Sequence, residues 1–112
     1  MKNLEIIKGD ANFFGNKKLS SLGKLSIVTG DAWFIDTNIK DLGQLQYIGG
    51  TANFQNNIGI KSLNKLTFIG GFVVFWNSTI EDLGALKYIS RDAYCAEDQT
   101  KIISLLKKSN IV

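Results

Sequence analysis

Apolar residues return along this chain at a nearly constant spacing. One phrase recurs five times: a β-branched residue, a polar or glycine-containing corner, and then Ala-x-Phe or a close variant. Its copies begin at Ile7, Val28, Ile48, Ile69 and Ile89. The intervals are therefore 21, 20, 21 and 20 residues. A regular period of this size is typical of proteins that stack one structural unit on the next, so the pattern predicts a short solenoid.

The Ala-x-Phe segment alternates between fixed and variable residues. Successive side chains of a strand point to opposite faces, so Ala32 and Phe34 are expected to face inward and Trp33 outward. Copies of such a strand in successive turns would pair as a parallel sheet. The residues just before the phrase are also expected to face inward, and they are Ile27, Tyr47, Phe68 and Tyr88.

A second repeated segment, Leu-x-x-Leu or a close variant, lies between the strands, for example at 42–45. The residues directly before it are of the types that cap helices, and they are Ser21, Asp41, Ser62 and Asp82. The pattern predicts one helical or 3₁₀ turn per repeat, kept short by glycines such as Gly43. Gly30 and Gly50 precede their strands and predict a tight corner there.

The predicted fold class is an α/β repeat solenoid, with a short parallel β-strand and one 3₁₀ or helical turn in each repeat and a C-terminal capping helix. The 112 residues are expected to form a single domain. Its expected parts are a half repeat at 1–8, repeats at about 9–29, 30–49, 50–70 and 71–90, a terminal strand at 91–96, and the helix at about 98–109. The helix is predicted from an apolar stripe with charges that suit the helix dipole, namely Ile102, Leu105 and Leu106 with Asp98 before them and Lys107 and Lys108 after them.

The strand and the asparagine that follows it, as in the segment 32–39, resemble the corresponding part of leucine-rich repeats. The segments 45–54 and 66–75 are similar to the turns of receptor L domains, which are short β-helical relatives. This resemblance covers the chain from Leu4 to Cys95. It implies a leucine-rich-repeat-like or short β-helical coil that recognises protein through its strand face and uses no cofactor. Ala32 and its equivalents stand where leucine-rich repeats carry leucine.

Candidate chemistry is sparse in this sequence. The chain has no histidine, which excludes Ser-His-Asp and Cys-His catalysis and histidine-based zinc sites. Asp10 and Asp31 occupy the same repeat position and are interpreted as carboxylates that cap backbone N–H groups at the corner. The single cysteine, Cys95, replaces an inward phenylalanine and is interpreted as a core residue. We therefore expect no catalytic residue, no metal and no cofactor, and we predict that the protein is not an enzyme.

Charge and hydropathy narrow the choice of partners. The formal net charge is +3, but the lysines are scattered, whereas nucleic-acid binding normally requires a denser basic stripe. No run approaches the ~20 apolar residues of a membrane span, and the first residues do not form a secretory signal. The expected location is the cytoplasm.

The outward strand positions hold the most informative residues. Several are aromatic, and exposed tryptophan and tyrosine on a sheet mark interaction sites. The predicted partner-binding residues are Trp33, Ile35, Phe72, Val74, Trp76 and Tyr94. A frame shifted by one residue would instead bury Asp10, Asp31, Asn12 and Asn53, which is unfavourable without partners.

The sequence thus predicts a non-enzymatic module that binds another protein through this face. Three alternatives stay open. The chain is small enough to be an inhibitor of a host enzyme, of the kind that phages or mobile elements encode. The same face could form a homodimer in a structural element, or lysines and aromatics could bind nucleic acid weakly. The C-terminal helix or a second copy of the chain could also cover the face.

Overall fold

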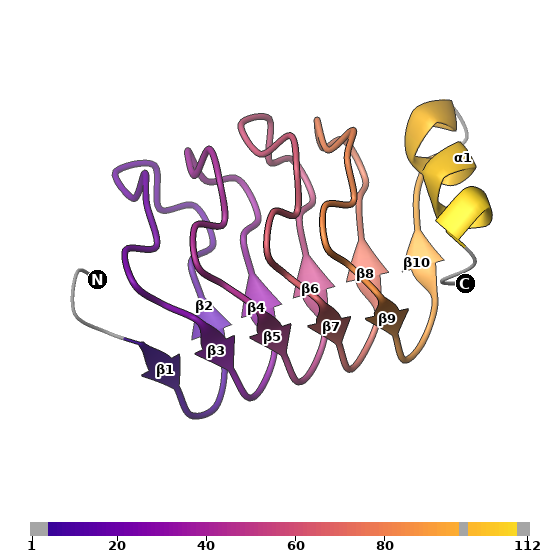
Figure 1. Cartoon of the computed structure of the whole chain (residues 1–112). Coiled ribbons are helices and arrows are strands. Elements are labelled where there is room, and N and C mark those ends of the chain that lie inside the picture. Colours follow the sequence, from indigo (N-terminus) through magenta and orange to yellow (C-terminus); the bar gives the residue numbers. More distant parts are fainter. Residues whose placement is uncertain (1–4, 97–98, 110–112) are drawn as a thin grey trace.

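The computed structural model describes residues 5–96 and 99–109. The chain winds as a parallel β-solenoid of about four turns, with a helix at its C-terminal end (Figure 1). This confirms the predicted repeat solenoid. The long dimension of the molecule is 36 Å, against 24 and 18 Å across it.

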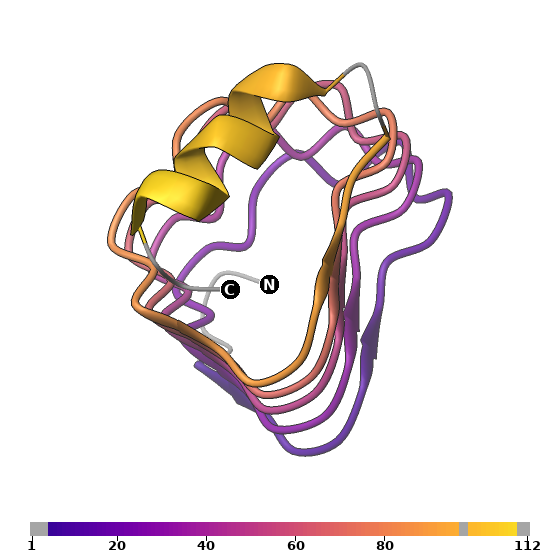
Figure 2. The same ribbon diagram turned by 90° about the vertical axis from the view of Figure 1, so that its right-hand side faces the viewer.

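Each full turn contributes two short strands instead of the single strand that we expected. The first sheet has the order β1-β3-β5-β7-β9, and its strands are Ile6–Ile7, Ile27–Val28, Tyr47–Ile48, Phe68–Ile69 and Tyr88–Ile89. The second sheet has the order β10-β8-β6-β4-β2, and its strands are Ala11–Asn12, Ala32–Trp33, Ala52–Asn53, Val73–Val74 and Ala93–Tyr94 for β2, β4, β6, β8 and β10. Seen along the coil axis, the two sheets form two sides that meet at a corner, and loops form the remaining side (Figure 2).

All strand pairs are parallel and keep equivalent residues in register, such as Ala32 with Ala52 in the second sheet. Stacking identical positions builds continuous columns of buried side chains inside the coil. The column with the largest side chains is aromatic: Phe34 stacks on Phe54 with ring centroids 5.3 Å apart, and Phe54 on Phe75 at 6.0 Å. All three side chains are fully buried, as the alternation in the sequence predicted.

The corner between the sheets requires glycine because successive backbones approach closely there. A Cβ on Gly50 would collide with the Asp31 carboxylate and would lie only 3.0 Å from the carbonyl carbon of Gly30. The carboxylates at this corner accept backbone hydrogen bonds. Oδ1 of Asp10 accepts from the N–H of Asp31, and Oδ1 of Asp31 accepts from the N–H of Thr51, both at 2.8 Å. The interpretation of these aspartates as capping groups is confirmed.

The Leu-x-x-Leu segments form β-turns, so the expected helical or 3₁₀ turn is wrong. The N–H of Leu45 donates to the carbonyl of Leu42 at 3.0 Å, but the residue after the first leucine is left-handed, with φ of 55° at Gly43 and 50° at Asn64. That backbone conformation cannot continue a right-handed helix. The residue predicted to cap this turn still accepts a backbone hydrogen bond, because Oδ1 of Asp41 accepts from the N–H of Gly43 at 2.8 Å.

Helix α1, Thr100–Ser109, lies across the C-terminal end of the coil (Figure 2). Ile102 and Leu106 are buried and Leu105 is half-buried, which agrees with the predicted apolar stripe. The helix covers the end of the core and leaves the outer face of the second sheet uncovered. Asp98, which we expected at the helix start, lies outside the described residues, as do residues 1–4 of the expected half repeat 1–8.

The strands fall within the repeat units expected from the sequence as follows. Each of the units 9–29, 30–49, 50–70 and 71–90 holds one strand of the second sheet and then one strand of the first. Strand β10 lies within the terminal segment 91–96, and β1 lies within 1–8.

Candidate functional site

The outer face of the second sheet carries the six residues that the sequence analysis singled out. Trp33, Val74 and Tyr94 form one outward column with Asn53, because β4, β6, β8 and β10 are paired in register. Their strand neighbours Ala32 and Val73 are fully buried. Trp76 is 47% exposed and Tyr94 41% exposed, whereas Phe34 and Phe75 lie inside the coil. The tryptophans therefore face outward, as the alternation predicted.

Four of the six residues form one group at the C-terminal end of this face, and they are Phe72, Val74, Trp76 and Tyr94. The Phe72 and Tyr94 rings are in contact, with centroids 5.5 Å apart and planes inclined by 41°. The guanidinium of Arg91 lies 5.6 Å from the centre of the Phe72 ring, which is the geometry of a cation–π interaction. We call these four residues the aromatic group.

Trp33 and Ile35 lie apart from the aromatic group, on the other side of strand β6. The outward residues of that strand are polar, and Oδ1 of Asn53 accepts a hydrogen bond from the N–H of Gln55 at 2.9 Å. Two strand spacings of about 4.8 Å separate Trp33 from Val74. The six predicted residues thus share a face, but a polar strip divides them into two clusters.

Two features of the surface were missed at the sequence level. Phe14 continues the outward column of Ile35 and Trp76 and is 64% exposed, so it belongs with the smaller cluster. Its place in the repeat, directly after the inward Phe13, assigns it to the outward column, but it was left out of the predicted partner-binding residues.

The second missed feature is an apolar row on the outer face of the first sheet. We expected Ile27, Tyr47, Phe68 and Tyr88 to face inward, and this is wrong. Their strand neighbours Val28, Ile48, Ile69 and Ile89 are buried, and adjacent residues of a strand must face opposite sides. Ile6 stands in the same register as Ile27. We call the five residues Ile6, Ile27, Tyr47, Phe68 and Tyr88 the outer row.

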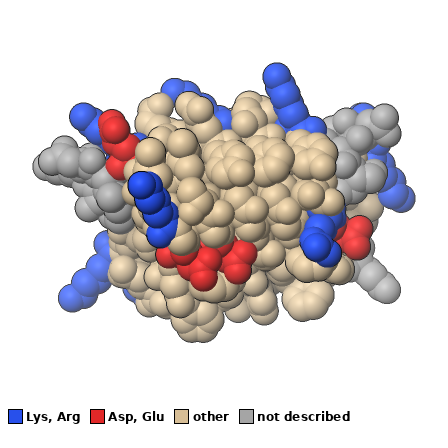
Figure 3. Space-filling model, turned by 90° about the horizontal axis from the view of Figure 1, so that it is seen from below, with Lys and Arg blue, Asp and Glu red and all other residues tan. Residues whose placement is uncertain are grey.

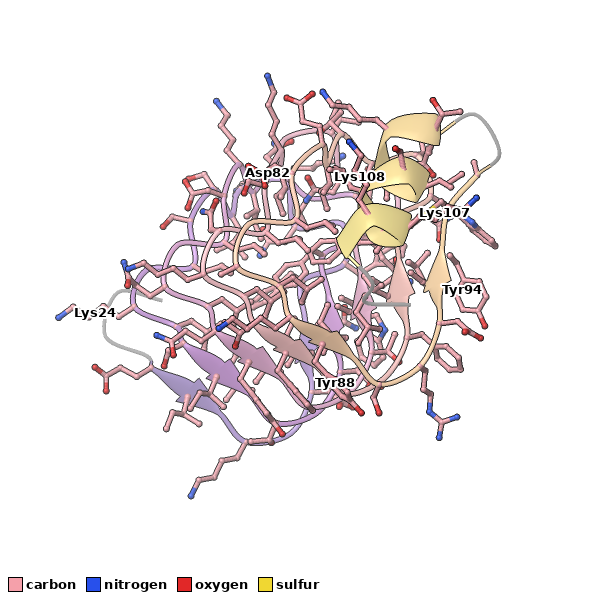
Figure 4. The ribbon with its side chains drawn as sticks, turned by 45° about the vertical axis from the view of Figure 1, so that its right-hand side comes forward. Lys24, Asp82, Tyr88, Tyr94, Lys107 and Lys108 are labelled. Carbon is pink, nitrogen blue, oxygen red and sulfur yellow. The ribbon has the colours of Figure 1, made fainter. Side chains whose placement is uncertain are left out.

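The aromatic members of the outer row are closely stacked. The centroids of Tyr47 and Phe68 are 4.9 Å apart with planes within 4°, and those of Phe68 and Tyr88 are 5.2 Å apart at 14°. Tyr47 also covers the backbone beside it, because a Cβ on Gly49 would lie 3.3 Å from the Tyr47 ring. Figure 4 shows Tyr88 and Tyr94 projecting away from the coil on different sides. The molecule therefore has two separate aromatic surfaces.

Charged side chains are rare on both sheet faces of the three central turns. Among the residues 26–35, 46–55 and 67–76, the only charged one is Asp31. Seen from the side of the corner, the middle of the molecule is largely uncharged apart from one group of acidic side chains (Figure 3). Both faces are thus suited to contacts that exclude water.

The described residues offer little for catalysis. They contain no group of three or more histidine, cysteine or acidic side chains that could hold a metal ion. Two shallow hollows flank helix α1, with volumes of about 240 and 210 Å³. Cys95 lines the smaller one. Burial raises the pKa of its thiol above the ordinary value of 9.0, which disfavours the reactive thiolate.

Comparison of the chain with protein-family models, curated proteins and solved structures gives no match. Among the described residues, no helix has both the length and the apolar character needed to cross a membrane.

Proposed function

We propose that this chain is a non-enzymatic module that binds a partner protein through the outer face of the second sheet. The aromatic group forms the centre of the contact. The observation that carries this proposal is the exposure of Trp76 and Tyr94 on a face where the three central turns bear only one charged residue, Asp31.

The interior of the coil does not need these side chains. Its columns are complete with Ala32, Phe34 and their equivalents, which are fully buried in the three central turns. Large aromatic side chains in water on a small protein are unfavourable unless a partner covers them, and Trp and Tyr are the residues that most often dominate binding energy. Their placement is therefore better explained by recognition than by folding.

The polar strip on β6 would set the orientation of the partner. The side-chain amide of Gln55 and the remaining hydrogen-bonding capacity of Asn53 lie between the two apolar clusters. A partner that buries both clusters must also satisfy these amides, because buried polar groups without hydrogen bonds are destabilising. This requirement favours a protein surface with polar groups between two apolar patches.

We also propose that the chain is related to leucine-rich repeats and receptor L domains. It is supported by the period of 20 to 21 residues and by one in-register parallel strand of each sheet in every full turn. The two-sheet cross-section favours the short β-helical form over the single-sheet horseshoe.

Site-specific photo-crosslinking in cells of the source organism would test the binding role. A photoreactive phenylalanine analogue replaces Trp76 in one variant and Ile58 in another. Ile58 is 71% exposed in the loop that follows β6, so it is a matched exposed position outside the face. We expect a partner protein to be captured from position 76 and not from position 58.

The captured partner then allows affinities to be compared. Trp76→Ala should weaken its binding by about 30-fold, the effect of a residue that contributes about 2 kcal/mol, while Ile58→Ala should leave it unchanged. Equal capture at both positions, or equal affinity of the two alanine variants, would contradict the proposal. Circular dichroism of each variant establishes that the fold is retained.

A further inference from the structure

The outer row of the first sheet is a second exposed apolar surface, on a different side of the coil from the aromatic group. Tyr88 is 50% exposed and Ile6 46% exposed. Helix α1 lies across the end of the coil and does not reach this face (Figures 1 and 2). Among the described residues, nothing covers the row.

The column beside the outer row has opposite charges at its two ends. It consists of Glu5, Ser26, Gln46, Thr67 and Lys87, which directly precede the strands of the first sheet and are exposed or half-buried, so their side chains also lie outside the coil. Its three middle members are uncharged, and neither Glu5 nor Lys87 forms an ion pair within the described part of the chain. A surface with its negative charge at one end and its positive charge at the other is complementary to a copy of itself turned end for end.

We propose that two copies of this chain form a homodimer through their first sheets, with the outer rows face to face and the coil axes antiparallel. A two-fold axis would pass through Tyr47, at the middle of the row. Each column then faces its own copy in reverse order. Glu5 of each chain lies opposite Lys87 of the second copy, which gives two ion pairs.

The sizes of the side chains favour the same arrangement. One end of the outer row is aliphatic, with Ile6 and Ile27, and the other end is aromatic, with Phe68 and Tyr88. In antiparallel packing each isoleucine meets an aromatic ring, so the two faces stay equally separated along the row. Parallel packing would place ring on ring at one end and isoleucine on isoleucine at the other, leaving a wedge-shaped gap.

The remaining charges near the row do not oppose this arrangement. Lys8 would face Ser90 of the second copy, which occupies the same column at the other end. Arg91 follows Ser90, but its guanidinium lies over the Phe72 ring of the second sheet, away from the contact. The aromatic group also stays free, so the dimer would present two partner-binding faces.

The contact is small. The row spans four strand spacings, about 19 Å, and is one side chain wide, whereas stable interfaces bury about 800 Å² on each partner. We therefore expect a weak, concentration-dependent dimer with a dissociation constant of about 100 µM.

Light scattering across a concentration series tests this surface. Between about 10 µM and about 1 mM, the mass of the unmodified chain should rise from 12.4 kDa toward twice that value. Tyr47→Arg places two like charges at the two-fold axis and should keep the mass at that of one chain. Ile58→Arg adds the same charge at an exposed loop position and should dimerise like the unmodified chain. Trp76→Ala should do so too, which separates this test from that of the binding role.

Charge exchange tests the antiparallel arrangement and uses only exposed side chains, which the fold does not require. Glu5→Lys and Lys87→Glu should each weaken the dimer by about tenfold at low salt. The double variant restores both cross pairs and should recover the affinity of the unmodified chain. In a parallel dimer Glu5 would instead face Lys8 of the second copy, so the double variant would stay weakened.

Three results would overturn the proposal. The unmodified chain could keep the mass of one chain up to about 1 mM, or Tyr47→Arg, with its fold retained by circular dichroism, could dimerise like the unmodified chain. Failure of the double charge exchange to recover affinity would rule out the antiparallel dimer.

Discussion

The coil contains two stacked aromatic columns that differ mainly in which side of the backbone they occupy. The inner column, Phe13, Phe34, Phe54 and Phe75, has centroid spacings between 5.3 and 6.0 Å. The aromatic part of the outer row has spacings of 4.9 and 5.2 Å. The register of the parallel sheets therefore produces ring stacking on either side. The two columns differ in their exposure to water, because the inner column is packed inside the coil and the outer row stays in contact with solvent.

This contrast separates residues that the fold needs from residues that are available for binding. An inner ring adds to the free energy of unfolding through its transfer from water, its packing and its stacking. An outer ring adds little besides stacking and partial cover of the backbone. Substitutions in the two columns should therefore differ in their effect on stability much more than the similar spacings suggest.

The largest effect is expected from Phe54→Ala. Phe54 is fully buried between Phe34 and Phe75, so its removal leaves a cavity in the middle of the inner column. The free energy of unfolding should fall by about 3–5 kcal/mol, a large part of the 5–15 kcal/mol that is typical of a domain. Urea titration followed by circular dichroism measures it. A loss below about 1 kcal/mol would mean that the ring is not part of the core.

A smaller effect is expected from Asn57→Ala, because Asn57 is a fully buried polar residue of the interior. Its Oδ1 accepts from the N–H groups of Gly59 and Ile60, both at 3.0 Å, and its Nδ2 donates to Oγ1 of Thr37 at 2.9 Å. Removing the side-chain amide leaves these two N–H groups and the Thr37 hydroxyl without this hydrogen-bond partner. The free energy of unfolding should therefore fall by about 1–3 kcal/mol.

Asn38→Ala is the matched control for this substitution. Asn38 is exposed and donates one hydrogen bond to the carbonyl of Lys17, so its loss should change the free energy of unfolding by less than about 0.5 kcal/mol. Equal losses for the two asparagines in urea titration would contradict the view that burial makes Asn57 important.

Phe68→Ala tests the outer row directly. Phe68 stacks between Tyr47 and Tyr88 and lies over Gly70, but it remains half-buried. The free energy of unfolding should fall by about 1 kcal/mol, measured in urea at a concentration low enough to keep the chain monomeric. A loss as large as that of Phe54→Ala would show that the outer row is structural, and would remove the reason to regard it as a binding surface.

The same contrast explains how far sequence reasoning could go. The inner column was predictable because the constant Ala and Phe of each repeat alternate with residues that vary widely between repeats, such as Asp31 and Trp33. The outer row was not recognised, because Tyr47 and Ile48 are both apolar and hydrophobicity does not say which of them faces inward. The strand geometry decides it, since adjacent residues of an extended segment cannot both enter the core. The first sheet was missed for the same reason.

The candidate site was predictable as a face, but its internal division was not. Trp33, Val74 and Tyr94 share a column by repeat position alone. Asn53 and Gln55 separate Trp33 from Val74 and Tyr94. This separation depends on the order of the strands in space, which follows from the register once the coil is known. The β-turns were missed because Asp41 before leucine suits a helix cap and an Asx turn equally well, and only the left-handed Gly43 distinguishes them.

The smallest effect concerns the end of the inner column, where Cys95 takes the place of a phenylalanine beside helix α1. Burial raises the pKa of this thiol in the folded chain. Below its pKa in the unfolded chain, the thiol is neutral in both states and stability does not depend on its titration. As the pH rises through that value and toward the folded pKa, the unfolded state loses the proton first, so the folded state loses stability.

Urea midpoints should therefore fall slightly more between pH 7 and pH 10 for the unmodified chain than for Cys95→Ser. Iodoacetamide should also alkylate the thiol of the folded chain several-fold more slowly than the thiol of the unfolded chain. Equal alkylation rates would place Cys95 with the outer, water-exposed residues rather than at the end of the inner column.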